Sequence, residues 1–271
     1  MEKDHKHHNI ASFEKEGFFI VKGLLNTREV ADINLEFHQE WLKLVAKGEI
    51  KQEPDRPLET LFPRLRDFHL HNEKILEYLL NPKITNVVRE AIGDEPLVVS
   101  TSYFFKPPGA KGLPLHQDNF SVGVSPGTTF SVWISLSESY PENGGMVVVP
   151  KSHRVGILQP KSVSKDEYSY AEELPLPEGY ETLPLTTTPG DVICFSGDLL
   201  HSSLVNQTTD RFRHAFLIHF SSSKLEKVLI NYNRLFSSDG KRVRRKLNTN
   251  FWDMYSGSGR KKEWSGVTLN N

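Results

Sequence analysis

The chain is poor in the features that define several large classes of protein. It has 271 residues and one cysteine, Cys194, which excludes an internal disulfide framework and favours a reducing compartment. Cys194 stands in the apolar run 192–195, a setting typical of a small buried residue rather than a nucleophile. No apolar stretch approaches the ~20 residues that a membrane-spanning helix requires. The polar N-terminus has no signal-peptide core, so we expect a cytoplasmic protein without a membrane partner.

Neither sign of charge is in excess. Lys and Arg number 33 and Asp and Glu number 34, so the chain has no global basic field that would hold nucleic acid. It also has no basic aromatic face, which disfavours an enzyme that modifies nucleic acid. We therefore expect a small-molecule substrate and no nucleic-acid partner, and the oligomeric state stays open.

Two segments nevertheless carry local charge. Residues 1–9 hold three of the eleven histidines, and we interpret them as a solvated tail. The segment that begins at Ser237 is basic and predicts a solvated surface, with positive charges at Lys241, Arg242, Arg244, Arg245, Lys246, Arg260, Lys261 and Lys262. Aromatic residues in the same segment predict that part of it docks: Phe251, Trp252, Tyr255 and Trp264.

The order of the expected elements predicts one domain, because no internal repeat and no clear linker divides the chain. The N-terminal part, about 10–95, is expected to be mainly helical and to contain one short strand at 18–21. Apolar residues at helical spacing, with a capping pattern formed by Asn26 and Glu29, predict a helix over 27–47. Two further helices are predicted over 73–80 and 84–92, and 51–63 is expected to be a loop.

The composition changes at Pro96, where β-branched and aromatic residues become frequent. Strands are predicted at 97–105, 128–136, 146–149, 180–185, 192–195 and 213–220. Short strands separated by turns indicate a sandwich or barrel over about 96–221, with the preceding helices packed against one sheet. Residues 151–177 are interpreted as a long surface insertion, and 222–271 as a C-terminal extension.

The candidate chemistry is organised around His116-Gln117-Asp118. One intervening residue lets an imidazole and a carboxylate point the same way from an extended segment. His201, which follows a turn and an apolar strand, is the best candidate for a third ligand. Two histidines and one carboxylate form the facial triad of non-haem Fe(II) oxygenases, which leaves coordination positions open.

A second set of residues suits a dicarboxylate. Arg213 precedes an apolar strand, and arginine offers a carboxylate a planar fork that stays protonated. Ser203 lies close to His201 in sequence and adds a possible hydrogen bond, and Lys106 adds positive charge. Arg211 is the rival of Arg213, but it stands in a turn and we expect it to be solvated.

These residues belong to a longer series of motifs that resembles the phytanoyl-CoA dioxygenase family, from about Phe13 to Phe220. The series comprises Gly17-Phe-Phe-Ile-Val, Lys106-Pro-Pro, Pro114-Leu-His116-Gln117-Asp118, Val132-Trp133, Asn143-Gly-Gly145, Pro150-Lys-Ser-His153, Gly190-Asp191, His201-Ser-Ser203 and Phe212-Arg213-x-Ala215. The chain differs in carrying Ser202 where the family usually has glycine, and in a His201–Arg213 spacing one residue longer than usual.

The resemblance implies a double-stranded β-helix (a jelly-roll, cupin-like core), mainly β with flanking helices, and dependence on Fe(II), 2-oxoglutarate and O2. It implies that His116, Asp118 and His201 are the catalytic iron ligands. It also implies that the 2-oxoglutarate site is formed by Lys106, Trp133, Ser203 and Arg213. We further expect Gln117, Asn119 and Phe120 to shape the substrate pocket.

The implied reaction is hydroxylation of an unactivated C–H of a small-molecule metabolite, which would be a polar metabolite, a natural product or an acyl-CoA, with release of succinate and CO2. A carboxylate at Asp118 fills the position that halogenating relatives leave to chloride, so hydroxylation is favoured over chlorination. The alternative is a cupin-like metal-binding protein that is not an oxygenase.

Overall fold

The computed structural model describes residues 2–162, 172–249 and 267–268. Its larger sheet has the order β1 (Phe18–Val21), β10 (Val192–Ser196), β5 (Phe130–Ser135), β12 (Ala215–Ser222), β3 (Pro96–Phe104), β14 (Leu235–Ser237) and β15 (Arg242–Val243). Strand β2 (Leu65–Arg66) also pairs with β3, and β17 (Val267–Thr268) pairs with β2. The smaller sheet has the order β4 (Leu113–His116), β11 (His201–Ser203), β6 (Met146–Val148) and β9 (Leu183–Pro184). Antiparallel neighbours that are far apart in sequence make this the expected double-stranded β-helix.

Two small ribbons complete the β structure. Strand β7 (Lys161–Ser162) pairs with β8 (Glu172–Glu173) in the predicted insertion, and β13 (Lys227–Val228) pairs with β16 (Lys246–Leu247) in the C-terminal extension.

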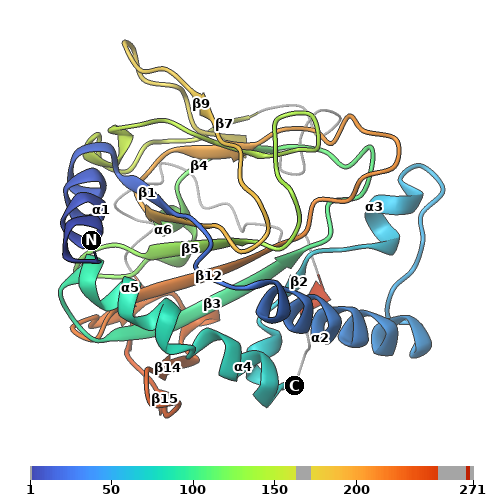
Figure 1. Cartoon of the computed structure of the whole chain (residues 1–271), viewed down its shortest axis with the longest axis horizontal. Coiled ribbons are helices and arrows are strands. Elements are labelled where there is room, and N and C mark those ends of the chain that lie inside the picture. Colours follow the sequence, from blue (N-terminus) through green and yellow to red (C-terminus); the bar gives the residue numbers. More distant parts are fainter. Residues whose placement is uncertain (1, 163–171, 250–266, 269–271) are drawn as a thin grey trace.

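The helices are α1 (Glu2–Glu16), α2 (Thr27–Ala46), α3 (Pro57–Leu61), α4 (Glu73–Leu79), α5 (Pro82–Ile92) and α6 (Asp118–Val122), with short 3-10 helices at Phe68–Leu70, Ser152–Arg154 and Ile230–Tyr232. Figure 1 shows α2, α4 and α5 along one face of the larger sheet, with the smaller sheet on the opposite side. The capping pattern predicted for α2 is confirmed, because Asn26 and Glu29 each accept a hydrogen bond from the other's backbone N–H. Within the described residues, no helix has the length and apolarity needed to cross a membrane.

Strand alternation sorts the side chains of the larger sheet into two cores. On β12, Phe216 and Ile218 pack toward the helices with Phe37 of α2. Ala215 and Leu217 point the other way and pack with Val148 of the smaller sheet. The second face is the interior of the β-helix, and it is the face that the candidate site uses.

The sequence predictions differ from the structure at several boundaries. Helix α3 lies inside the predicted loop 51–63, where Pro57 stands at the first helical turn and its fixed φ favours a helix start. The strand predicted over 180–185 shrinks to β9, which ends on Pro184 at the edge of the smaller sheet, because proline cannot donate to the ladder. Helix α1 continues back to Glu2, so the backbone of the predicted N-terminal tail is helical.

The basic C-terminal segment is described only up to residue 249, apart from β17. Lys241, Arg242, Arg244 and Lys246 are exposed, as predicted. Arg245 instead donates to the backbone carbonyl of Ser223 and is half-buried. The predicted docking aromatics and the later basic residues lie outside the described residues.

Candidate metal centre and anion pocket

The smaller sheet brings the three predicted metal ligands together. His201 at the start of β11 pairs with His116 at the end of β4, so the two imidazoles face the same space. Nε2 of His116 lies 3.7 Å and Nε2 of His201 lies 3.6 Å from Oδ1 of Asp118. One ligand atom from each of the three residues lies within 4.8 Å of the others. Two imidazole nitrogens and one carboxylate oxygen are the donor set that suits Fe(II), so these residues fit the implied metal.

Backbone carbonyls fix which nitrogen each histidine offers. Nδ1 of His116 lies 2.8 Å from the carbonyl oxygen of Pro114, and Nδ1 of His201 lies 3.0 Å from that of Leu199. A carbonyl only accepts, so each Nδ1 carries the proton and each Nε2 keeps its lone pair for a metal.

The local backbone around Asp118 differs from the sequence prediction. Gln117 is extended, but Asp118 is the first residue of helix α6 rather than part of a continuing strand. The side chains of His116 and Asp118 therefore converge because strand β4 is followed by helix α6. The expected alternation of side chains along an extended strand does not explain their common direction.

A hydrogen-bonded network that sequence reasoning missed holds the other oxygen of Asp118. The Ser131 hydroxyl donates to Oδ2 of Asp118 at 2.7 Å, and Nδ1 of His219 lies 3.0 Å from the Ser131 oxygen. Burial alone raises the pKa of Asp118, but His219, His201, His116 and the Ser131 hydroxyl outweigh it and hold that pKa well below its ordinary value. Asp118 is thus kept ionised, with Oδ1 facing the two histidines. Ser131 on β5 and His219 on β12 are paired opposite each other, and no sequence motif predicts this register.

Exposure is uneven around the triad. The side chain of His116 is 26% exposed, whereas those of His201 and Asp118 are 7% and 8% exposed. The centre is therefore most accessible to small molecules on the His116 side.

Arg213 is buried in the interior, two residues before β12 begins. Its guanidinium lies 5.5 Å from the Trp133 ring centre, and its Nη2 donates to the carbonyl oxygen of Gly144. Its buried Nε has no hydrogen-bond partner among the described residues, an orphaned donor that a carboxylate would satisfy. Burial lowers the pKa of Arg213 to about 9, still above neutral pH. The rival Arg211 is exposed, with Glu138 at 4.0 Å, as predicted for a solvated turn.

Lys106 and Ser203 lie in the same part of the interior. Lys106 Nζ lies 3.0 Å from the Ser203 hydroxyl oxygen, and burial followed by the charge of Arg213 lowers the Lys106 pKa well below its usual range. Gly144, at φ +82°, explains the Asn-Gly-Gly motif, because a Cβ there would collide with the Lys106 side chain. Close packing of Gly144 against Lys106 is therefore part of how this pocket is shaped.

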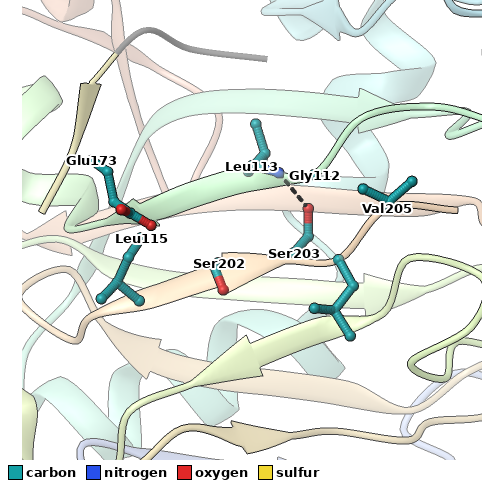
Figure 2. Close-up of a pocket in the computed structure, with 8 residues that line it drawn as sticks. Gly112, Leu113, Leu115, Glu173, Ser202, Ser203 and Val205 are labelled. Carbon is teal, nitrogen blue, oxygen red and sulfur yellow. Dashed lines mark hydrogen bonds between the residues drawn. The ribbon is translucent and has the colours of Figure 1, made fainter. Parts of the chain in front are cut away.

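A separate pocket of about 220 Å³ lies along β4 and β11, and it is lined by Gly112, Leu113, Leu115, Glu173, Ser202, Ser203, Leu204 and Val205. Figure 2 shows Ser203 among these lining residues, where its hydroxyl accepts the backbone N–H of Leu113. This pocket shares Ser203 with the candidate site but contains none of the triad residues.

The predicted substrate residues have other contacts in the structure. Gln117 is fully buried: its Nε2 donates to the carbonyls of Gly156 and Asp198, and its Oε1 accepts from Leu158 N–H. Gln117 thus braces the loops around the triad with both ends of its amide, and its part in shaping the substrate pocket stays a prediction. Asn119 and Phe120 are also buried, and their place in the substrate pocket stays a prediction.

Comparison with known proteins places this geometry in context. The family model described as "Phytanoyl-CoA dioxygenase (PhyH)" matches residues 13–215. A phytanoyl-CoA dioxygenase of Arabidopsis thaliana is 30% identical over 129 residues, which cover 47% of this chain and 45% of that protein. The ectoine dioxygenase of Sphingopyxis alaskensis is 25% identical, with 80% of this chain and 76% of that protein covered. The chain spans about half the length of the first curated relatives it matches.

Solved structures agree on the fold. The epimerase SnoN in complex with Fe3+, alpha ketoglutarate and nogalamycin RO superposes with a TM-score of 0.65 at 19% identity, covering 99% of this chain and 97% of that one. EctD from S. alaskensis with bound Fe gives a TM-score of 0.65 at 19% identity, covering 90% of this chain and 81% of that one.

Proposed function

The chain belongs to the phytanoyl-CoA dioxygenase family, and from this premise we propose that it is an Fe(II)- and 2-oxoglutarate-dependent dioxygenase. We propose that it hydroxylates an unactivated C–H of a small-molecule metabolite and releases succinate and CO2. The observation that carries the proposal is the joint presence, in one β-helix interior, of a His-Asp-His cluster and the buried guanidinium of Arg213.

In this proposal His116, Asp118 and His201 hold Fe(II). The support is their donor set and the backbone carbonyls that keep both Nε2 atoms free. Ser131 and His219 orient Asp118, so that one carboxylate oxygen is offered to the metal and the other is held by hydrogen bonds.

Arg213 holds the distal carboxylate of 2-oxoglutarate. The support is its orphaned Nε, its burial at 3% exposure and its position over Trp133. Ser203 and Lys106 add hydrogen bonds to the same end, and Trp133 forms an apolar wall that excludes water and strengthens the charge pairing.

When bound, Fe(II), 2-oxoglutarate and O2 supply the oxidation, in which one oxygen atom goes into succinate and the other into the substrate. The protein orients these partners and excludes water from them. The Asp118 carboxylate occupies the position that chloride would need, which supports hydroxylation over chlorination.

The primary substrate is sought with a metabolite library, by mass spectrometry of products that gain one oxygen atom. We expect at least one compound to gain oxygen only when Fe(II) and 2-oxoglutarate are both present. The ectoine dioxygenase and the phytanoyl-CoA dioxygenases give the library its first two chemical classes, small polar metabolites and acyl-CoA esters. A protein that binds the metal but converts no 2-oxoglutarate would favour the cupin-like alternative.

A further inference from the structure

The C-terminal extension carries a concentration of positive charge that the proposed function does not use. Residues 224–246 contain eight Lys and Arg residues against two carboxylates, Glu226 and Asp239, in a chain whose formal net charge is -1. The excess of Asp and Glu is therefore carried by the remainder of the chain. Figure 1 shows β14 and β15 of this segment at the edge of the molecule, remote from β4 and β9 of the smaller sheet.

Backbone pairing brings several of these cations together. Strand β13 runs parallel to β16, and Lys227 pairs with Lys246. Neighbouring strands lie about 4.8 Å apart, so the two ammonium-bearing side chains start close together. Arg244 stands two residues before Lys246, and all three side chains are exposed. Three cations are thus collected on and beside one two-stranded ribbon.

A fourth cation lies on a segment that is bonded to the same ribbon. The Asn233 side chain accepts the backbone N–H of Arg245 and donates to its carbonyl oxygen. This places the backbone of the exposed Arg234 beside the strand that carries Arg244 and Lys246. Arg245 itself has a structural role, because its guanidinium donates to backbone carbonyl groups of the extension.

The described carboxylates leave this charge unbalanced. Among the described residues from 224 onward, the one ion pair joins Lys241 to Asp239, outside the ribbon. Glu226 lines a groove of about 500 Å³ together with Arg244 and Lys246, but it forms no ion pair with either within the described ranges. Like charges on neighbouring strands repel one another. An anionic group that lies over the ribbon would therefore stabilise it.

Exposed apolar side chains accompany the cations. Ile230, two residues after β13, is 69% exposed, the largest value among the big apolar side chains of the described residues, and Leu247 on β16 is 43% exposed. A soluble polyanion gains nothing from such side chains. A lipid surface uses both kinds of residue, because cations bind anionic headgroups while apolar side chains enter the boundary between headgroups and acyl chains. The combination therefore favours an anionic membrane over other anionic partners.

We propose that six exposed residues form a peripheral docking surface for an anionic phospholipid membrane: Lys227, Arg234, Arg244, Lys246, Ile230 and Leu247. Attachment of this kind needs no spanning segment, so it is compatible with the lack of a membrane-crossing helix among the described residues. It replaces the expectation, drawn from the sequence, that the protein has no membrane partner. Each cation close to an anionic lipid surface strengthens binding roughly five-fold, so four cations together contribute several-hundred-fold.

The test measures co-sedimentation of the full chain with vesicles of phosphatidylcholine, alone or mixed with phosphatidylserine. We expect binding to the phosphatidylserine vesicles only, and weaker binding as the salt concentration rises, because counterions screen exposed charges. Replacing Lys227, Arg244 and Lys246 together with glutamine should lower the partition constant roughly a hundred-fold. The matched control replaces three exposed cations elsewhere, Arg28, Lys47 and Lys51, with glutamine and should leave binding unchanged.

Ile230→Ser separates a lipid surface from a soluble polyanion. It should weaken binding to the phosphatidylserine vesicles and leave binding to heparin unchanged. Heparin binding as tight as vesicle binding, with neither affected by Ile230→Ser, would assign the surface to a polyanion other than a membrane and overturn the proposal. No binding to phosphatidylserine vesicles, or equal binding by the triple variant, would also overturn it. If the triple variant melts at a lower temperature than the unmodified chain, Lys246→Gln alone replaces it, with a roughly five-fold loss expected.

Discussion

Replacing Arg213 with lysine tests the proposed cosubstrate pocket, because it keeps the positive charge and removes the planar fork. Arg213 is 3% exposed and donates to the Gly144 carbonyl from Nη2, while Nε is left for a ligand. Lysine cannot maintain both contacts from one point charge. We therefore expect weaker 2-oxoglutarate binding and little change in Fe(II) affinity.

The size of the effect follows from the interactions that are lost. A hydrogen bond to a charged group is worth about 1.5–3 kcal/mol, which corresponds to roughly a ten- to hundred-fold change in affinity. The apparent KM for 2-oxoglutarate should rise by about that factor, because the lost contact is one that binds the ground state.

The assay is a 2-oxoglutarate titration followed by succinate release, with Arg211→Lys as the matched control. Arg211 is an exposed neighbour whose described ion pair with Glu138 is long, 4.0 Å, and such pairs contribute little. A large effect from Arg211→Lys and none from Arg213→Lys would refute the assignment of the carboxylate partner. No effect from either would mean that the cosubstrate binds elsewhere.

Three further predictions concern the triad, the reaction and the fold. Ser131→Ala releases Oδ2 of Asp118 and should raise the Fe(II) dissociation constant roughly ten- to a hundred-fold, as measured by metal titration. The control is Ser135→Ala, which should leave that constant unchanged because the Ser135 hydroxyl donates to Thr187 instead. With the substrate found, mass spectrometry in chloride-rich buffer should detect added oxygen and no chlorine, and a chlorinated main product would contradict the role given to Asp118. Burial, with the charges of His38 and Arg213, lowers the pKa of His214 to about 4, so its contribution to stability is present above about pH 6.5 and is lost as the pH falls toward 4, by up to ~1.4 kcal/mol per pH unit. Urea unfolding should therefore show that the free energy of unfolding falls less between pH 7 and pH 5 in His214→Phe than in the unmodified chain. Equal losses would argue against the lowered pKa of His214.

Local sequence patterns predicted the helices and strands that are determined by interactions between residues close together in sequence. The capping pair Asn26 and Glu29 located the start of α2, and the apolar runs located β3, β5 and β10 to within one or two residues. The ordered motifs identified His116, Asp118 and His201 before any geometry was known, and the structure brings those three residues together.

The long His201–Arg213 spacing is accommodated by a clamped loop. Asn206 Nδ2 donates to the backbone carbonyls of Lys106 and Arg211, and the Arg213 N–H donates to the same Lys106 carbonyl. These contacts bring Arg213 into the interior although β12 begins only at Ala215. Sequence spacing alone does not reveal such a clamp.

The remaining site residues depend on pairing between distant strands, which one sequence does not specify. Ser131 meets His219 only through the register of β5 with β12. The contacts of Gln117 could not be predicted for the same reason, because its amide binds three loop backbone groups that lie far from it in sequence.

The most direct test of the central claim is conversion of 2-oxoglutarate to succinate without any added primary substrate. We predict slow, Fe(II)-dependent succinate formation by the unmodified chain, abolished together with tight Fe(II) binding in His116→Ala and His201→Ala. His71→Ala serves as the control, because His71 is exposed and lies in the N-terminal helical region. Succinate formation at the unmodified rate in either triad variant, or no Fe(II)-dependent succinate from the unmodified chain, would contradict the account.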